Sequence, residues 1–348
     1  MATWLVTGGT GFIGANSART LVERNHTVVL VDNLSRVTAQ SNLDWLHDHV
    51  PRGWSFVKLD VRDAAGVDGV FREHGPFDVV LHLAGQVAVT SSVVDPRHDL
   101  ETNVFGTYNL LEATRRFSPA AAFINASTNK VYGALEHHRT SEQPTRYVDL
   151  DAPAGIAETQ PLDPCTPYGC SKAAADFYTL DHARIYGLKA LTLRQSCIYG
   201  PRQFGVEDQG WVAWFAMAAR LDLPLTIYGD GKQVRDLLHV DDLVALYLLA
   251  ADRAEACLGR AYNVEGGPAN TLSLLELIER LALWSGAPLD PSFAEARHGD
   301  QRVFVADSSR ALEELGWSPQ IGIDAGLPDL LGFVDGHSEG ARTMLPIA

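Results

Sequence analysis

The sequence predicts an α/β protein built around a doubly wound parallel sheet. Short apolar runs that are typical of buried strands alternate with helical patterns over the first 195 residues. A glycine-rich turn separates the first apolar run from the first helical pattern. Small and polar residues follow the ends of the next runs, at the edge where parallel sheets bind their ligands. These three observations together indicate the fold class.

The first unit consists of a strand, a glycine-rich turn and a helix. Residues 4–7 predict a buried strand, and after the GxxGxxG turn of residues 8–14 a helical pattern runs to about Arg24. Such glycines permit a tight turn, close approach of the backbone to a pyrophosphate, and close packing of helix on strand. The N-terminus of the helix adds free N–H donors. We therefore expect a Rossmann-type dinucleotide site at Gly8, Gly11, Phe12, Ile13 and Gly14.

The second apolar run, residues 28–31, ends in an acid that bears on the choice of cofactor. Asp32 follows Gly14 by eighteen residues. At about this spacing a carboxylate binds the hydroxyl groups of the adenosine ribose and repels a 2′-phosphate. NAD is therefore favoured over NADP, with Asn33 as a neighbouring contact. Arg36 leaves NADP open, because a nearby arginine is able to accept the extra phosphate.

The third and fourth strands are expected at residues 55–58 and 79–83, with a helix over residues 63–74 between them. The small residues after the fourth strand let the backbone pass close beside a dinucleotide. His82, inside that strand, is interpreted as a core histidine rather than a catalyst. The expected cofactor contacts in this part of the chain are Asp60, Val61, Leu83, Ala84, Gly85 and Gln86.

A helix over residues 102–117 and a fifth strand over residues 121–126 continue the alternation, and Asn103 is expected to support the cofactor loop. Residues 127–133 (STNKVYG) then lie at the carboxyl end of the fifth strand. Thr128 offers a hydroxyl that is able to bond a substrate oxygen and to share its proton with Tyr168. The alternative is a strand-end hydroxyl that bonds its own backbone.

Residues 134–167 are polar and proline-rich, which indicates a long irregular active-site loop. The run EHHR at residues 136–139 has no further ligands at a useful spacing, so no metal site is predicted. After the loop comes YGCSK at residues 168–172.

On a helix, Tyr168 and Lys172 lie one turn apart on the same face. A lysine ammonium near a phenol favours the phenolate, so the pKa of Tyr168 is expected to fall toward working pH. Such a tyrosine takes the proton from a sugar hydroxyl while a hydride leaves the carbon beneath it. Taken alone, a YxxxK match is better explained by an ordinary helix start, because such matches carry a high false-positive risk. The glycine turn and Thr128 make the catalytic interpretation the better one.

Charge and composition exclude several classes of partner. The 348 residues carry a formal net charge of −15, which argues against nucleic acid or an anionic membrane as the main partner. Four cysteines without a CxxC pair predict reduced thiols. The longest apolar run, residues 243–251, is about half of what crosses a bilayer. With no leader-like start, a cytoplasmic protein is expected.

Taken together, the glycine turn, Asp32, Thr128, Tyr168 and Lys172 resemble the extended short-chain dehydrogenase/reductase family, which contains NAD-dependent nucleotide-sugar epimerases and dehydratases. The resemblance covers nearly the whole chain. Several stretches look closest to the branch that epimerises CDP-sugars at carbon 2. These stretches are residues 82–88 (HLAGQVA), 127–133 (STNKVYG), 167–172 (PYGCSK), 208–212 (DQGWV), 231–236 (GKQVRD) and 300–307 (DQRVFVAD).

The resemblance implies a catalytic set of Thr128, Tyr168 and Lys172, with Lys172 also bonding the nicotinamide ribose. It implies an NAD-binding domain of residues 1–195 plus about 236–262, and a smaller α/β lobe of residues 196–235 and 263–340 that binds a nucleotide-diphosphate sugar, CDP-hexose being favoured. Expected substrate contacts are Thr128, Asn129, Gln203, Gln209, Gly210, Arg235 and Arg302, the two arginines serving the diphosphate because a guanidinium fork suits phosphate oxygens. A homodimer or tetramer is also implied, pairing helices near residues 102–117 and 168–186.

Two residues after Thr128 bear on the reaction. Dehydratases of this family carry an acidic pair there, whereas this chain has Asn129 and Lys130, so dehydration is disfavoured. An epimerase needs only to oxidise one carbinol and to return the hydride to the other face. Two alternatives remain: a UDP- or CDP-hexose 4-epimerase or decarboxylase, and a dinucleotide-sensing protein without catalysis.

The last third of the chain gives fewer signals. A strand at residues 190–193 and a helix at 241–251 are expected to return to the sheet. Residues 228–231 (YGDG) predict a hairpin-like turn, and residues 272–284 an amphipathic helix capped by Ser273. Beyond residues 317–319 no element is predicted.

Overall fold

The computed structural model describes residues 1–297 and 299–344. Its centre is a seven-stranded sheet in the order β12-β8-β5-β4-β1-β2-β3, and every neighbouring pair in it is parallel. This confirms the predicted doubly wound fold class. The strands are β1 (Thr3–Thr7), β2 (Thr27–Asp32), β3 (Trp54–Lys58), β4 (Val79–His82), β5 (Ala122–Thr128), β8 (Lys189–Gln195) and β12 (Ala261–Val264).

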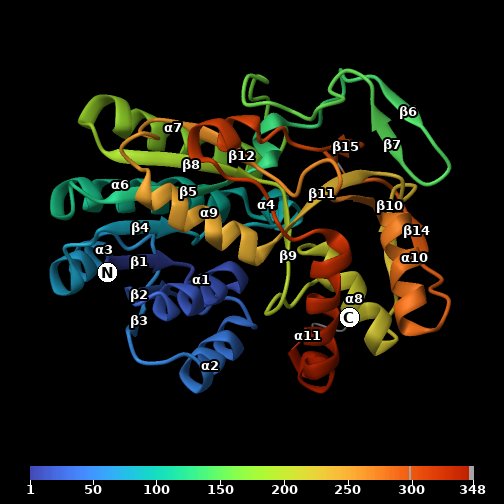
Figure 1. Cartoon of the computed structure of the whole chain (residues 1–348), viewed down its shortest axis with the longest axis horizontal. Coiled ribbons are helices and arrows are strands. Elements are labelled where there is room, and N and C mark those ends of the chain that lie inside the picture. The colour runs from blue at the N-terminus through green and yellow to red at the C-terminus, as the bar shows by residue number, and fades with distance from the viewer. Residues whose placement is uncertain (298, 345–348) are drawn as a thin grey trace.

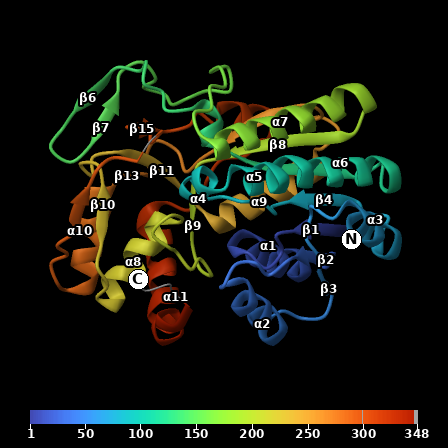
Figure 2. The same cartoon turned by 180° about the vertical axis from the view of Figure 1, so that it is seen from behind.

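Helices cover both faces of this sheet (Figures 1 and 2). On β4, Leu81 faces one hydrophobic cluster and Val80 faces another, as the alternation of side chains along a strand requires. The first cluster is shared with α1 (Phe12–Glu23), α2 (Ala39–His49) and α9 (Val240–Asp252). The second is shared with α3 (Ala64–His74), α6 (Gly106–Phe117) and α7 (Pro167–Tyr186).

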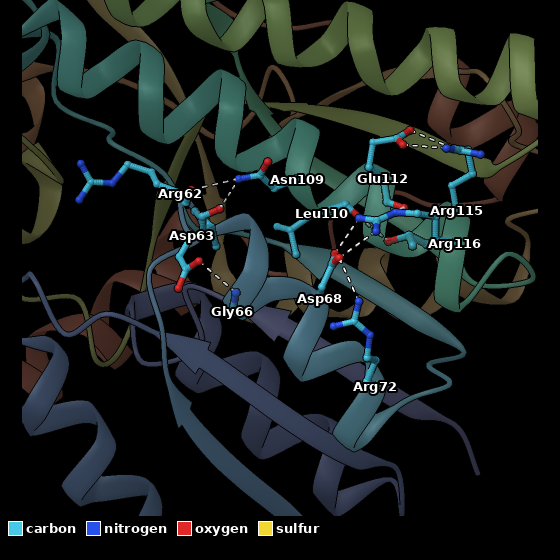
Figure 3. Close-up of polar contacts among 12 residues, drawn as sticks. Arg62, Asp63, Gly66, Asp68, Arg72, Asn109, Leu110, Glu112, Arg115 and Arg116 are labelled. Atoms are coloured by element: carbon cyan, nitrogen blue, oxygen red, sulfur yellow. Dashed lines mark hydrogen bonds and ion pairs between the residues drawn. The ribbon is translucent and has the colours of Figure 1, made fainter.

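The loop after β3 is fixed against α6 by polar contacts (Figure 3). Asn109 on α6 donates its side-chain amide to the backbone oxygen of Val61 at 3.0 Å. Near the other end of α6, both terminal nitrogens of Arg116 donate to Asp68 on α3, at 2.8 and 2.7 Å. The contact of Asn109 positions the segment after β3 that carries the expected cofactor residues Asp60 and Val61.

The helix predicted over residues 102–117 is the last of several consecutive helical elements, and as α6 it begins at Gly106. It is preceded by α4 (Val89–Val94), α5 (Pro96–Leu100) and a π-helical turn, η1 (Glu101–Phe105). Asp95 caps α5 by accepting a hydrogen bond from the backbone N–H of His98 at 3.0 Å, and Pro96 occupies the first turn. The start signal was thus an N-cap acid followed by proline, which favours helix initiation.

The remaining elements gather at one end of the sheet (Figures 1 and 2). Strands β9 (Cys197–Tyr199), β11 (Val234–His239), β13 (Thr271–Ser273) and β15 (Val303–Phe304) form one small sheet, and β10 (Thr226–Tyr228) pairs with β14 (Ser292–Ala294). Helices α8 (Trp211–Leu221), α10 (Leu274–Ser285) and α11 (Ile323–Met344) pack around a separate apolar cluster. A π-helical turn, η3 (Ala311–Leu315), precedes α11. Ser273 caps α10 as predicted.

Two predictions in this region are wrong. Residues 228–231 do not close a hairpin, because β10 and β11 pair with different partners, β14 and β13. Residues 134–167 are not irregular throughout. The short 3₁₀ turn η2 (Asn129–Tyr132) precedes them, and they contain an antiparallel hairpin of β6 (Thr140–Glu142) and β7 (Tyr147–Asp149). Arg146 in the hairpin is ion-paired with Glu276 on α10 at 2.5 Å, which explains how a polar segment is ordered there.

A buried polar network joins α7 to the sheet. The carboxylate of Asp176 on α7 accepts hydrogen bonds from Arg194 Nε at 2.9 Å and from Thr192 Oγ1 at 2.7 Å, both on β8. Arg194 also donates to the hydroxyl oxygen of Tyr132 at 3.0 Å, and that hydroxyl donates to Asn263 on β12 at 2.7 Å. All five side chains are buried. Because these polar groups satisfy one another, the network fixes the rotation and height of α7 over the sheet.

None of the helices within residues 1–297 and 299–344 is both long and apolar enough to cross a bilayer.

We predict that Asp176→Asn lowers the free energy of unfolding by about 3–5 kcal/mol, because it leaves the buried charge of Arg194 without its counter-charge. Urea denaturation followed by circular dichroism measures the change. The matched control is Asp324→Asn, whose partner Arg280 and own side chain are solvent-exposed, and which should change stability by less than about 1 kcal/mol. Equal effects of the two substitutions would contradict the role assigned to the network.

Candidate active site

The catalytic candidates meet where β5 ends and α7 begins. Thr128 is the last residue of β5, and Tyr168 is the second residue of α7. Thr166 caps α7 by accepting a hydrogen bond from the backbone N–H of Gly169 at 3.1 Å. The backbone N–H of Tyr168 donates to Ser92 Oγ at 3.1 Å, which fixes the backbone from which the ring extends. The Thr128 hydroxyl is near enough to the Tyr168 phenol to act on its pKa. The same hydroxyl donates to the side-chain oxygen of Asn129 at 3.2 Å and accepts from the backbone N–H of Lys130 at 3.3 Å, so the alternative of a strand-end hydroxyl that bonds the local backbone is also met.

The protonation of the site differs from the prediction. Burial raises the pKa of Tyr168 to about 12, against the opposing effects of the Thr128 hydrogen bond and the charge of Arg36. Burial also lowers the pKa of Lys172 to about 8, although Asp176 and Asp99 act in the other direction. The expected depression of the Tyr168 pKa by Lys172 is therefore wrong for this state. The physical reason is the orientation of the Lys172 side chain, whose Nζ donates to the backbone oxygen of Ala126 at 2.5 Å.

The glycine turn has the geometry of a dinucleotide cradle. Gly8 has a φ of +66°, and a Cβ placed on Gly14 would lie 2.3 Å from the backbone oxygen of Gly8. No side chain caps the N-terminus of α1, so the first N–H groups of that helix are open to an anion. The hydroxyl of Thr10 in the turn is buried without a partner among the described residues. These features fit a pyrophosphate.

The acid after β2 is tied to this turn. One oxygen of Asp32 accepts from the backbone N–H of Thr10 at 3.2 Å, and the other accepts from Leu34 at 2.9 Å. Asn33 donates to Asp60 at 2.9 Å, so the ends of β2 and β3 are linked. This places a carboxylate at the carboxyl edge of the sheet, beside the glycine turn, where a ribose would be bound.

Asn103 joins the loop after β4 to α7. Its side-chain oxygen accepts from the backbone N–H of Gln86 at 2.9 Å, and its amide donates to the backbone oxygen of Gln86 and to Ser171 Oγ. His82 at the end of β4 lies between the hydroxyls of Thr7 and Thr107, at 2.7 and 3.0 Å. Burial lowers the pKa of His82 to about 3, so the prediction of a neutral core histidine is confirmed.

A cavity of about 380 Å³ extends from the catalytic residues into the small sheets. Its lining includes Thr128, Tyr168 and Lys172 as well as the aromatic side chains of Trp211 and Tyr228. Eleven sequence-predicted residues line it: Phe12, Ile13, Leu83, Thr128, Asn129, Tyr168, Lys172, Gln203, Gln209, Gly210 and Arg235. The other predicted cofactor residues lie outside this lining, along the strand ends: Gly8, Gly11, Gly14, Asp32, Asn33, Asp60, Val61, Ala84, Gly85, Gln86 and Asn103.

The structure separates the two arginines that the sequence assigned to a diphosphate. Arg235 lines the cavity, whereas Arg302 lies outside its lining, with its guanidinium 5.3 Å from the ring centre of Tyr147 and 3.4 Å from Thr140 Oγ1. Arg297 lines the cavity instead, 4.1 Å over the ring of Tyr228. The sequence held no signal for Arg297, because it lies in a loop without periodicity or motif.

The two residues after Thr128 also line the cavity, and neither is an acid. The Asn129 amide donates to Gln301 at 3.1 Å, and Lys130 is ion-paired with Asp300 at 3.1 Å. Lys130 was considered in the sequence only as a missing acid, although its place two residues after Thr128 was the signal for a cavity cation. The cavity thus holds the Tyr168 phenol, two neighbours that form hydrogen bonds, and several cations beside a dinucleotide cradle.

Comparison with known proteins places the chain among sugar-nucleotide enzymes. Residues 5–330 match the family described as GDP-mannose 4,6 dehydratase. CDP-paratose 2-epimerase of Salmonella typhi is 43% identical over 328 residues, which are 93% of this chain and 96% of that protein. The structure of UDP-glucose 4-epimerase from Thermotoga maritima with UDP-glucose is 31% identical, with a TM-score of 0.81 over 96% of this chain and 99% of that one. The structure of dTDP-glucose 4,6-dehydratase from Streptomyces venezuelae with NAD bound is 27% identical, with a TM-score of 0.82 over 98% and 99%. The chain therefore belongs to the GDP-mannose 4,6 dehydratase family of extended short-chain dehydrogenases/reductases.

Proposed function

We propose that this protein is an NAD-dependent nucleotide-sugar epimerase of the CDP-paratose 2-epimerase type. One observation carries the proposal: the Thr128, Tyr168 and Lys172 set is intact in a cavity where the positions of a dehydratase's acids hold Asn129 and Lys130. Elimination of water needs an acid and a base beside the sugar. Oxidation and re-reduction of one carbinol do not. The 43% identity to CDP-paratose 2-epimerase supports a CDP-deoxyhexose as the substrate.

In the proposed reaction the chain's own residues move one proton and hold one oxygen. NAD, when bound, supplies the acceptor and later the donor of the hydride. Because burial raises the pKa of Tyr168 to about 12, the phenol first has to lose its own proton. In the phenolate form Tyr168 then takes the proton of the sugar hydroxyl, while the Thr128 hydroxyl in the same cavity holds the same oxygen. After the keto sugar has presented its other face, Tyr168 returns the proton. Because Tyr168 is buried in a site without a second acid at residues 129 and 130, the proton has one carrier.

In this proposal each lobe binds a different ligand. Residues 1–195 and about 236–262 bind NAD, through the glycine turn, Asp32, Asn33 and the loops after β3 and β4. Residues 196–235 and 263–340 bind the nucleotide, with Gln203, Gln209 and Gly210 toward the sugar and base. Asp32 supports NAD over NADP, since its carboxylate repels a 2′-phosphate.

A homodimer is part of the same proposal. Several large apolar side chains on the helices of the NAD-binding part are solvent-exposed. They lie on η1, α6 and α7, which pack against one another, and a second copy of the same helices would cover them. The exposed side chains are Phe105, Tyr108, Phe177, Tyr178, Ile185 and Tyr186.

The substrate assignment is tested by turnover of purified protein with CDP-paratose, CDP-glucose, UDP-glucose and UDP-glucuronate. We expect interconversion of CDP-paratose and CDP-tyvelose, with bound NAD(H) in the purified protein and no net NADH released. A primary kinetic isotope effect on turnover with substrate deuterated at carbon 2, and none with substrate deuterated at carbon 4, identifies the carbon that is oxidised. Turnover of the UDP-sugars alone would instead support the alternative of a 4-epimerase or decarboxylase, and active protein without NAD(H) would refute the proposal.

We predict that Tyr168→Phe lowers kcat by about 10²–10⁴-fold, because it removes the one group that carries the hydroxyl proton. Fluorescence titration should show NAD binding close to that of the wild type, since Phe keeps the ring. Tyr147→Phe is the matched control, as this tyrosine lies on β7, outside the cavity lining and outside the proposed interface between copies. Retention of full activity by Tyr168→Phe would remove Tyr168 from the mechanism.

We predict that kcat/KM falls as pH rises through about 8, the pKa to which burial lowers Lys172. A lowered pKa means that the ammonium is present below this pH and is lost above it. A pH–rate profile between pH 6 and 10 measures the effect. Lys172→Arg, with a guanidinium that stays charged, should have lower activity but no fall near this pH. A wild-type rate that rises through the same range would contradict the assignment.

A further inference from the structure

Three N–H donors converge on one oxygen in the cavity wall. Oδ1 of Asp300 accepts from Arg235 Nη2 at 2.6 Å, from Lys130 Nζ at 3.1 Å and from the backbone N–H of Gln301 at 3.2 Å. Asp300, Lys130 and Arg235 all line the cavity. Two of the donors are cationic, and they come from η2 and β11, which are about a hundred residues apart in the chain.

This arrangement is an anion site already filled by a side chain. A phosphate oxygen is held in proteins by the same set of donors, namely lysine, arginine and backbone N–H. Although burial by itself would raise it, the charges of Arg235 and Lys130 hold the pKa of Asp300 well below its ordinary value. The carboxyl group is therefore an anion at neutral pH. Without it, Lys130 and Arg235 would face the cavity as two neighbouring cations with no counter-charge between them.

The site is also fixed relative to the catalytic threonine. Gln301 accepts a hydrogen bond from the Asn129 amide at 3.1 Å and donates to the backbone oxygen of Gly133 at 2.7 Å. The segment that carries Asp300 is thereby attached to both ends of the turn that follows Thr128. Lys130 lies inside this turn, so its ammonium and the Thr128 hydroxyl belong to one rigid unit.

We propose that Lys130 is a substrate-binding residue that receives the diphosphate together with Arg235, and that Asp300 Oδ1 occupies the place of a phosphate oxygen until the substrate displaces it. The ligand class is a nucleoside diphosphate sugar, so the inference rests on the proposed function for that class but not for the base. Nothing in it requires cytosine, since a diphosphate is common to all nucleoside diphosphate sugars.

Lys130 in this role also bears on which carbon reacts. In a sugar nucleotide the diphosphate is attached to carbon 1, which is bonded to carbon 2 and lies across the ring from carbon 4. A phosphate held by a cation two residues after Thr128 brings the phosphate-bearing side of the ring toward the catalytic hydroxyls. Carbon 2 is then nearer to Tyr168 than carbon 4 is. The subsite therefore favours oxidation next to the anomeric carbon.

The test is calorimetric binding of CDP, UDP, cytidine and uridine to the full-length protein and three variants. Lys130→Met should weaken both diphosphates by about tenfold to a hundredfold, the worth of a hydrogen bond between charged groups, and leave the nucleosides unchanged. Asp300→Asn, which removes the competing anion but keeps the side-chain shape, should strengthen both diphosphates several-fold. Lys232→Met is the matched control, because this lysine is ion-paired with Glu142 on the hairpin and does not line the cavity.

Three results would overturn the inference. These are diphosphate affinities of Lys130→Met equal to those of Lys232→Met, an equal loss for diphosphates and nucleosides, and weaker diphosphate binding by Asp300→Asn. Lys130→Gln serves the same comparison if Lys130→Met is not folded by circular dichroism. Failure of the proposed function looks different: CDP-sugars would not turn over, while the Lys130 and Asp300 effects on CDP and UDP would remain.

Discussion

The buried network around Asp176 and Arg194 is the constraint on which the catalytic geometry depends. Tyr168, Lys172 and Asp176 follow one another at intervals of four residues, so they occupy one face of α7. The third of these residues is locked to β8 by Arg194 and Thr192, and the first two are thereby held over the end of β5. The same helix position that gives Lys172 a nearby anion gives the helix its anchor. Stability and proton chemistry therefore share a set of side chains, and neither is adjustable without the other.

Much of the fold was predictable because its signals are local. Alternating apolar runs marked the sheet, and the glycine spacing marked the turn, since only glycine allows the approach of residues 8 and 14. Ser273 was identified as a cap because its partner is three residues away. Helix α11 was missed, although its buried Leu327, Leu330, Leu331 and Val334 are spaced as on a helical face.

The direction of long side chains was not predictable, because it depends on partners far away in the chain. Lys172 points to the Ala126 carbonyl, and Arg302 to a hairpin more than 150 residues earlier. In a chain with a net charge of −15, three cavity cations are each held by a particular carboxylate: Lys130 and Arg235 by Asp300, and Arg297 by Asp208. Composition therefore describes the field at a distance, whereas these pairs decide what an anion meets inside.

The hairpin of β6 and β7 connects the two catalytic segments to the smaller lobe. The chain leaves β5 after Thr128, is ion-paired to Glu276 on α10 through Arg146, and enters α7 just before Tyr168. Thr128 and Tyr168 thus lie at the two ends of one segment of the chain. The middle of this segment is bound to α10. Because the middle of this segment is attached to α10, we expect a displacement of α10 relative to the sheet to shift Thr128 and Tyr168 together.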